Sequence, residues 1–260
     1  MSDGLSGRVQ SVDRALALLE ELARDDRGRR LTDLSRQTGL SLTTVHRLLT
    51  TLEQRRFVQF SATDNAWHIG LRAFAVGSSF ARERNFVAPA LPFLRRLRDQ
   101  TRETANLGVV EDSEVVLVNQ VQSREIMRAI SEVGGRSPMT ASGMGKVFLA
   151  SYTREEVNAV VRRHGMPRAT QSTLTCRDAL ETQLVQARDD GYAVDDEEHV
   201  PGLRCVAAPV YNDKADVVCA VSVSGLRMRM TPERLPTLGR LLAKTASEIT
   251  AALGGKPLVH

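Results

Sequence analysis

The sequence has 260 residues, of which 42% are hydrophobic and 25% charged, with a formal net charge of +4 at pH 7. These values are typical of a globular protein, and the longest apolar runs are far shorter than a membrane span of about 20 residues, which excludes a membrane-spanning helix. The length favours two domains, and the three cysteines, together with a start that lacks a leader-like apolar run, favour a cytoplasmic protein without a disulfide framework.

Residues 1–70 contain three predicted helices followed by two short strands. The first helix covers residues 12–23 and is expected to bury one face, made of Val12, Leu16, Leu19 and Ala23. The second begins near a Thr32 cap and ends at Gly39, and Ser41 can cap the third. The segments "FVQF" and "WHIG" flank the polar turn "SATDNA" and predict a hairpin. This order of elements predicts a winged helix-turn-helix.

The outer face of the third predicted helix carries short hydroxyl side chains and one arginine. Threonine can contact a phosphate or a thymine methyl group, and arginine can bind guanine through two hydrogen bonds. Arginines at the end of the helix are expected to contact the DNA backbone without reading sequence. The alternative is a small helical domain with a solvated polar face. The predicted DNA-binding residues are Thr43, Thr44, His46, Arg47, Thr50, Arg55 and Arg56.

The rest of the chain divides into a linker helix, residues 71–87, and a mixed domain, residues 88–260. Small residues in the linker favour close packing against a second subunit. Helices and strands follow without regular βαβ alternation, so the fold class is α+β. The predicted helices of the mixed domain cover 88–101, 142–152, 153–164, 177–191 and 231–255. The predicted strands cover 105–112, 114–121, 125–131, 192–198, 205–212 and 217–225.

The stretch "DDEEHVPGLRCVAAPV" (residues 195–210) has three interpretations. A metal site would use Asp195, Glu197 and His199 on one strand face together with Cys205, but it lacks a second histidine. A catalytic Cys205–His199 pair, oriented by Asp195, would have to bridge the turn "VPGL". The third interpretation is a pocket that only binds a ligand, with Asp196 and Glu198 on the solvated face.

Three stretches make the chain resemble the IclR family of bacterial transcriptional regulators, and the resemblance runs from "RVQSVDRALALLE" to the last predicted helix. They are "TGLSLTTVHRLLTTL", "TASGMGKVFLA" and "DDEEHVPGLRCVAAPVYN". The resemblance implies a winged helix-turn-helix, a linker helix and a C-terminal sensor domain similar to GAF domains. It further implies homodimers, often paired into tetramers on operator DNA, and no enzymatic activity, metal or cofactor. The branch it resembles most responds to small organic acids such as glyoxylate or pyruvate, and a repressor is expected.

The resemblance also implies an effector pocket. The backbone N–H groups where a loop enters a helix can hold a carboxylate. Two serines spaced two apart on a strand face the same side, and the aspartate can accept a hydrogen bond from a hydroxyl or hydrated carbonyl. Met144 departs from the small residue of glyoxylate-type members, which leaves the identity of the acid open. The implied pocket residues are Gly143, Met144, Asp195, Leu203, Cys205, Ser222 and Ser224.

Overall fold

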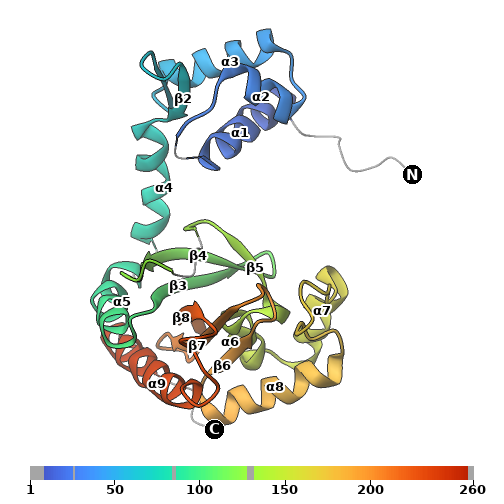
Figure 1. Cartoon of the computed structure of the whole chain (residues 1–260), viewed down its shortest axis with the longest axis vertical. Coiled ribbons are helices and arrows are strands. Elements are labelled where there is room, and N and C mark those ends of the chain that lie inside the picture. Colours follow the sequence, from blue (N-terminus) through green and yellow to red (C-terminus); the bar gives the residue numbers. More distant parts are fainter. Residues whose placement is uncertain (1–8, 26, 84–85, 128–131, 257–260) are drawn as a thin grey trace. The chain divides into compact units, whose positions relative to one another are not determined.

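The computed structural model describes residues 9–25, 27–83, 86–127 and 132–256, apart from the side chains of residues 78–83. The chain divides after Glu83 into two compact units (Figure 1). The N-terminal unit consists of α1 (Gln10–Ala23), α2 (Leu31–Thr38), α3 (Leu42–Gln54), β1 (Val58–Ser61), β2 (Ala66–Ile69) and α4 (Leu71–Glu83).

The turn between α2 and α3 has the local chemistry that the sequence predicts. Gly39 ends α2 with φ 69°, a left-handed conformation that glycine adopts without steric cost. Ser41 caps α3, and its side chain accepts the Thr44 N–H at 3.3 Å. The strands β1 and β2 then pair antiparallel as a hairpin. Three helices, a tight turn and a hairpin confirm the predicted winged helix-turn-helix.

Two details of the predicted helices are wrong. α1 does not bury Val12, Leu16 and Ala23, which are exposed; it buries Leu18 and Leu22 instead. The stripe that faces the core is therefore rotated around the helix, because the position of α2 and α3 decides which of two apolar stripes is covered. α2 begins at Leu31 after Arg30, so Thr32 lies inside the helix and does not cap it.

The C-terminal unit is built on one antiparallel sheet and its helices. Among the described residues the sheet has the order β5-β4-β3-β8-β7-β6, and each neighbouring pair runs antiparallel. The strands are β3 (Thr104–Glu111), β4 (Glu114–Val121), β5 (Arg136–Pro138), β6 (Ala193–Asp196), β7 (Leu203–Tyr211) and β8 (Val217–Leu226). The helices are α5 (Val87–Thr101), α6 (Gly143–Ser151), α7 (Arg154–His164), α8 (Arg177–Asp190) and α9 (Leu235–Ala252).

The two faces of this sheet pack against different helices. α5 and α9 lie together on one face and form one apolar core with the central strands. α6, α7 and α8 form a second core on the other face (Figure 1). Buried central strands with helices on both sides explain why "VVCAVSVSG" reads as a nearly continuous apolar run. The mixed α+β class of this unit is confirmed.

Most predicted strands agree with the structure to within a few residues. The strand predicted at 114–121 has the bounds of β4, and the turn before it contains Asp112 and Ser113 with φ 52° and 63°. Two successive positive φ values are what a tight hairpin needs. The strand predicted at 125–131 falls partly outside the described residues, since 128–131 are not described, and residues 122–127 are not a strand. The described strand that pairs with β4 on its outer side is β5.

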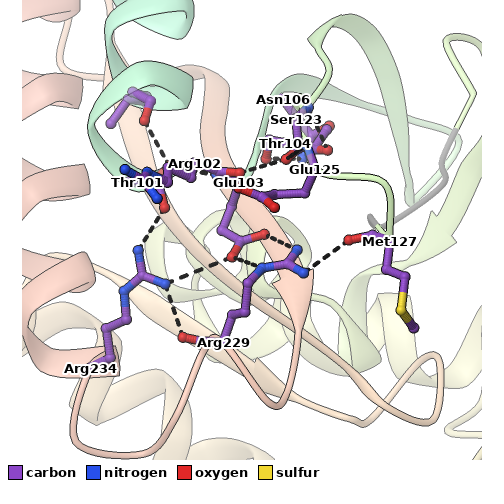
Figure 2. Close-up of polar contacts among 11 residues, drawn as sticks. Thr101, Arg102, Glu103, Thr104, Asn106, Ser123, Glu125, Met127, Arg229 and Arg234 are labelled. Carbon is purple, nitrogen blue, oxygen red and sulfur yellow. Dashed lines mark hydrogen bonds and ion pairs between the residues drawn. The ribbon is translucent and has the colours of Figure 1, made fainter.

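A buried ion cluster joins three segments at one end of the sheet (Figure 2). Glu103 has no exposed surface, and its two carboxylate oxygens accept hydrogen bonds from Arg229, both at 2.7 Å. Arg234 lies 3.7 Å from the same carboxylate and donates to the Thr101 carbonyl at 2.6 Å. Arg229 also donates to the Met127 carbonyl at 2.9 Å. The cluster thereby ties the start of β3 to the loops that follow β4 and β8.

Candidate functional site

A cavity of about 420 Å³ lies in the C-terminal unit, and every strand of the sheet contributes to its lining. Asn106 comes from β3 and Ser224 from the neighbouring β8. Cys205 of β7 is paired with Ser224, and Asp195 of β6 is paired with Cys205. These four polar side chains therefore form a row across adjacent strands, which is the arrangement that a small polar ligand can bridge.

Five of the seven residues implied as an effector pocket line this cavity, and two do not. Gly143 and Ser222 are buried and do not belong to the lining of the cavity. The lining residues from the implied set are Met144, Asp195, Leu203, Cys205 and Ser224. The structure thus brings most of the implied residues to one place, while their role in binding stays a prediction.

Asn106 is a polar residue of the cavity that the sequence interpretation missed. Its side-chain amide donates to Ser222 Oγ at 3.2 Å and to Ser224 Oγ at 3.1 Å. Gln120 in turn donates to Asn106 Oδ1 at 3.0 Å. The two serine hydroxyls therefore have a protein partner that orients them. A single asparagine inside the apolar strand "ANLGVV" was the available signal, because buried amides need hydrogen-bond partners.

Met144 shapes the cavity wall together with Gly108. A Cβ atom at Gly108 would lie 2.6 Å from Met144 Sδ, a distance that would force the methionine to move. The absence of a side chain at Gly108 therefore leaves the space that Met144 fills. The methionine expected to reshape the pocket does line it, and its flexible thioether can adapt to a bound molecule.

The start of α6 offers backbone donors beside the cavity. Ser142 caps this helix, and its Oγ accepts the Gly145 N–H at 3.1 Å. The first N–H groups of a helix have no acceptor within the helix, so those of Gly143 and Met144 are left open by α6 itself. Together with the positive end of the helix dipole, they suit an anion.

A buried ion pair lies behind the cavity. Lys146 of α6 is 0% exposed, and its ammonium group donates to Glu198 Oε1 and to Gln183 Oε1, both at 2.5 Å. Glu198 is buried, so the expectation that it lies on the solvated face is wrong; Asp196 is exposed as expected. The reason is local: Glu197 has φ 59°, which ends the strand and turns Glu198 inward.

Asp195 is an unusual carboxyl group because it is buried next to this pair. It is 8% exposed, and its Oδ1 accepts the Glu198 N–H at 2.8 Å. Burial raises the pKa of Asp195 to about 7, helped by the nearby Glu198 carboxylate and opposed by the backbone hydrogen bond and Lys146. A carboxyl group that holds its proton near neutral pH can donate a hydrogen bond to an anion.

The metal and nucleophile interpretations find no support. Because Glu197 breaks the strand, Asp195, Glu197 and His199 do not share a strand face. No group of three or more His, Cys, Asp or Glu residues suited to a metal occurs in the part of the chain that the structure describes. Burial raises the pKa of Cys205 to about 11, so its thiol is uncharged at neutral pH and is a weak nucleophile.

The predicted DNA-binding side chains lie on and after α3. Thr43, His46 and Arg47 are exposed, as are Arg55 and Arg56 after the helix, while Thr44 and Thr50 are half-buried. The Thr50 hydroxyl already donates a hydrogen bond within α3, to the His46 carbonyl at 2.9 Å. Beside this face lies a hollow of about 530 Å³, lined from α3 and, on α1, by Ser11 and Arg14. These two were not predicted.

Comparison with known proteins decides the family. The IclR helix-turn-helix domain matches residues 11–62, and the domain described as bacterial transcriptional regulator IclR C-terminal matches residues 79–251. The chain belongs to the IclR family. Members of this family are transcriptional regulators that carry an effector-binding C-terminal domain, so the alternative of an enzyme using Cys205, His199 and Asp195 is wrong.

Relatives within the IclR family cover nearly the whole chain. The acetate operon repressor of Salmonella typhimurium is 42% identical over 253 residues, which cover 96% of this chain and 92% of the relative. A crystal structure of a transcriptional regulator from Rhodococcus is 31% identical, covers 95% of this chain and 99% of its own, and has a TM-score of 0.82. An IclR homologue from Microbacterium hydrocarbonoxydans, crystallised with 4-hydroxybenzoate, is 23% identical with a TM-score of 0.79 over 93% of this chain and 99% of its own. Among the described helices, none has the length and apolarity to cross a membrane.

Proposed function

We propose that this chain is a repressor that binds operator DNA in the cytoplasm and is controlled by a small carboxylate bound in the cavity of its C-terminal unit. The observation that carries the proposal is the cavity itself, where the Ser224 hydroxyl, oriented by Asn106, and the start of α6 offer hydrogen-bond donors to one anion. Relatives named as repressors support the direction of control. The relative crystallised with 4-hydroxybenzoate supports an organic acid as ligand.

The DNA-binding role predicts that Arg47 reads a base edge. Arg47 is exposed on α3 while Val45 and Leu49 of the same helix are buried, which fixes its outward direction. Arg47→Ala should weaken binding to the cognate operator by about 1–3 kcal/mol and relax the preference at one base pair. Arg56→Ala is the control, because a backbone contact should weaken binding to all sequences alike. Fluorescence anisotropy with cognate and scrambled duplexes measures both, and equal affinity of the wild type for the two duplexes would contradict the proposal.

The effector role predicts different effects at the two serines. Ser224 lines the cavity and Ser222 does not, although both accept a hydrogen bond from Asn106. A hydrogen bond to a charged group contributes about 1.5–3 kcal/mol, so Ser224→Ala should weaken binding of the acid effector about tenfold or more. Ser222→Ala should leave the affinity within about threefold. Calorimetric titration compares the two variants, and equal losses would show that Ser224 makes no direct contact.

Because the pKa of Asp195 is raised to about 7, we expect anion binding in the cavity to depend on pH. The groups around Asp195 are Glu198 and Lys146, which pair with each other, the neutral thiol of Cys205, and His199, whose pKa burial lowers. A bound anion disfavours the carboxylate form, so Asp195 takes up a proton wherever it is ionised in the free protein. Affinity should therefore fall as pH rises above about 7, by up to about tenfold per unit. Asp195→Asn should abolish this dependence and the exposed Asp196→Asn should keep it; calorimetry from pH 6 to 9 tests both.

We also propose that the chain forms a homodimer, and that two dimers can pair into a tetramer on DNA. Within each chain, residues 71–87 form the linker between the domains 1–70 and 88–260. Apolar side chains remain exposed on the N-terminal unit, namely Val12 and Leu16 on α1 and Leu71 at the start of α4. Exposed apolar groups of this size favour burial against a second subunit. Light scattering that returned the monomer mass of 28.6 kDa at micromolar concentration would contradict the dimer.

A further inference from the structure

The cavity is much larger than the acids expected from the resemblance. Its volume is about 420 Å³. It falls in the range of about 300–1,000 Å³ of pockets that hold drug-sized molecules. Neighbouring strands lie about 4.8 Å apart, so a two-carbon acid spans one or two strands, whereas the lining reaches from β6 across the sheet to β5.

The lining is also divided by chemistry. Hydrogen-bonding groups lie on the central strands β3 and β8, at Asn106 and Ser224, and on β6, at Asp195, on the far side of β7. Apolar side chains line other parts of the cavity, namely Val115 and Leu117 on β4, Met144 on α6 and Leu203 at the start of β7, while the charged Glu132 and Arg136 line its β5 side. Burying an apolar group against such side chains is favourable only if the ligand has an apolar part to bury. Glyoxylate and pyruvate offer almost none.

Among the described residues of this lining, both arginines are bound by carboxylates, so neither is open to a second carboxylate of the ligand. Arg136 of β5 is bound by the Glu111 carboxylate at 2.5 Å and the Glu114 carboxylate at 3.3 Å. Arg204 of β7 is bound by Asp196 at 2.5 Å. Glu132, which also lines the cavity, adds a further negative charge at the β5 side. The far end of the cavity therefore disfavours a dicarboxylate.

From these three observations we infer that the effector is a monocarboxylic acid with an extended apolar body, larger than pyruvate. This inference rests on the proposed effector function. Its carboxylate binds at Ser224 and the start of α6, and its body lies against Leu117, Met144 and Leu203. The arrangement makes the apolar lining, and not the polar row, the part of the site that selects among acids.

The test is calorimetric titration of the full-length protein with straight-chain 2-oxo acids, from glyoxylate and pyruvate to 2-oxobutanoate, 2-oxopentanoate and 2-oxohexanoate. Burying one methylene group strengthens binding about fourfold, so affinity should rise by up to that factor with each added carbon. 2-Oxoglutarate has the same carbon chain as 2-oxopentanoate with a second carboxylate, and it should bind more weakly. Highest affinity for glyoxylate or pyruvate, or preference for 2-oxoglutarate over 2-oxopentanoate, would overturn the inference.

A pair of variants separates the apolar lining from general effects. Leu203 is half-buried in the lining, and Leu203→Ala should reduce the gain in affinity per added carbon. Val185→Ala removes an exposed apolar side chain of α8 that lies outside the lining. This variant should show the same gain in affinity per added carbon as the wild type. If no acid of the series binds the wild type, the proposed effector function itself fails. If short acids bind and longer ones do not gain, the function stands and this inference alone is wrong.

Discussion

Lys146→Met is expected to destabilise the C-terminal unit by about 3–5 kcal/mol, because it leaves a buried carboxylate without its cation. Lys146 is fully buried and the Glu198 side chain is only 3% exposed, so water cannot take the place of the lost ammonium group. Oε2 of Glu198 has no hydrogen-bond partner among the described residues, so it offers no second bond that could replace the one between Oε1 and Lys146. The measurement is urea unfolding followed by far-ultraviolet circular dichroism.

The same experiment contains two internal controls. The chain has one tryptophan, and Trp67 is buried in the N-terminal unit, so its fluorescence should report an unchanged transition. Adding Glu198→Leu to Lys146→Met removes the unpaired charge and should recover part of the lost stability, since a buried ion pair replaced by apolar groups is often neutral. Additive losses in the double variant would show that the two side chains do not interact.

Arg229→Ala is expected to lower the free energy of unfolding by about 3 kcal/mol, which is near the lower end of the loss for a broken buried ion pair. Glu103 has no exposed surface and receives both of its strong hydrogen bonds from Arg229 (Figure 2). Arg234 remains within 3.7 Å and Arg229 itself is 26% exposed, which together keep the loss from being larger. Lysine should not restore stability at this position, because it cannot form the two parallel bonds of the guanidinium group.

Arg227→Ala is the matched control for this variant. Arg227 lies two residues earlier in the chain and pairs with Glu197 at 3.3 Å, but its side chain is 66% exposed. Exposed pairs contribute about 0–1 kcal/mol, so the change in unfolding free energy should be small. If Arg227→Ala lowered the unfolding free energy as much as Arg229→Ala, removal of any arginine from this segment would be destabilising. The buried cluster would then contribute no more to stability than the exposed pair.

The sequence by itself determined the features whose causes lie within a few residues. Gly39 and Ser41 specify the turn before α3, and Asp112 and Ser113 specify the hairpin between β3 and β4. Period-2 and period-3.6 patterns located the strands and helices because each follows from the geometry of one element alone. The family motifs are local in the same sense, and they led to the correct class of regulator.

Only the tertiary structure decided which side chains meet. The α1 helix has two apolar stripes, and its own sequence does not say which one the neighbouring helices cover. Glu198 turns inward because Glu197 adopts a positive φ, and it then meets Lys146, 52 residues away. Asn106 joins the site through serines 116 and 118 residues further along the chain. Such contacts depend on the order of the strands in the sheet, and the residue pattern of one strand does not identify the strands that will pair with it.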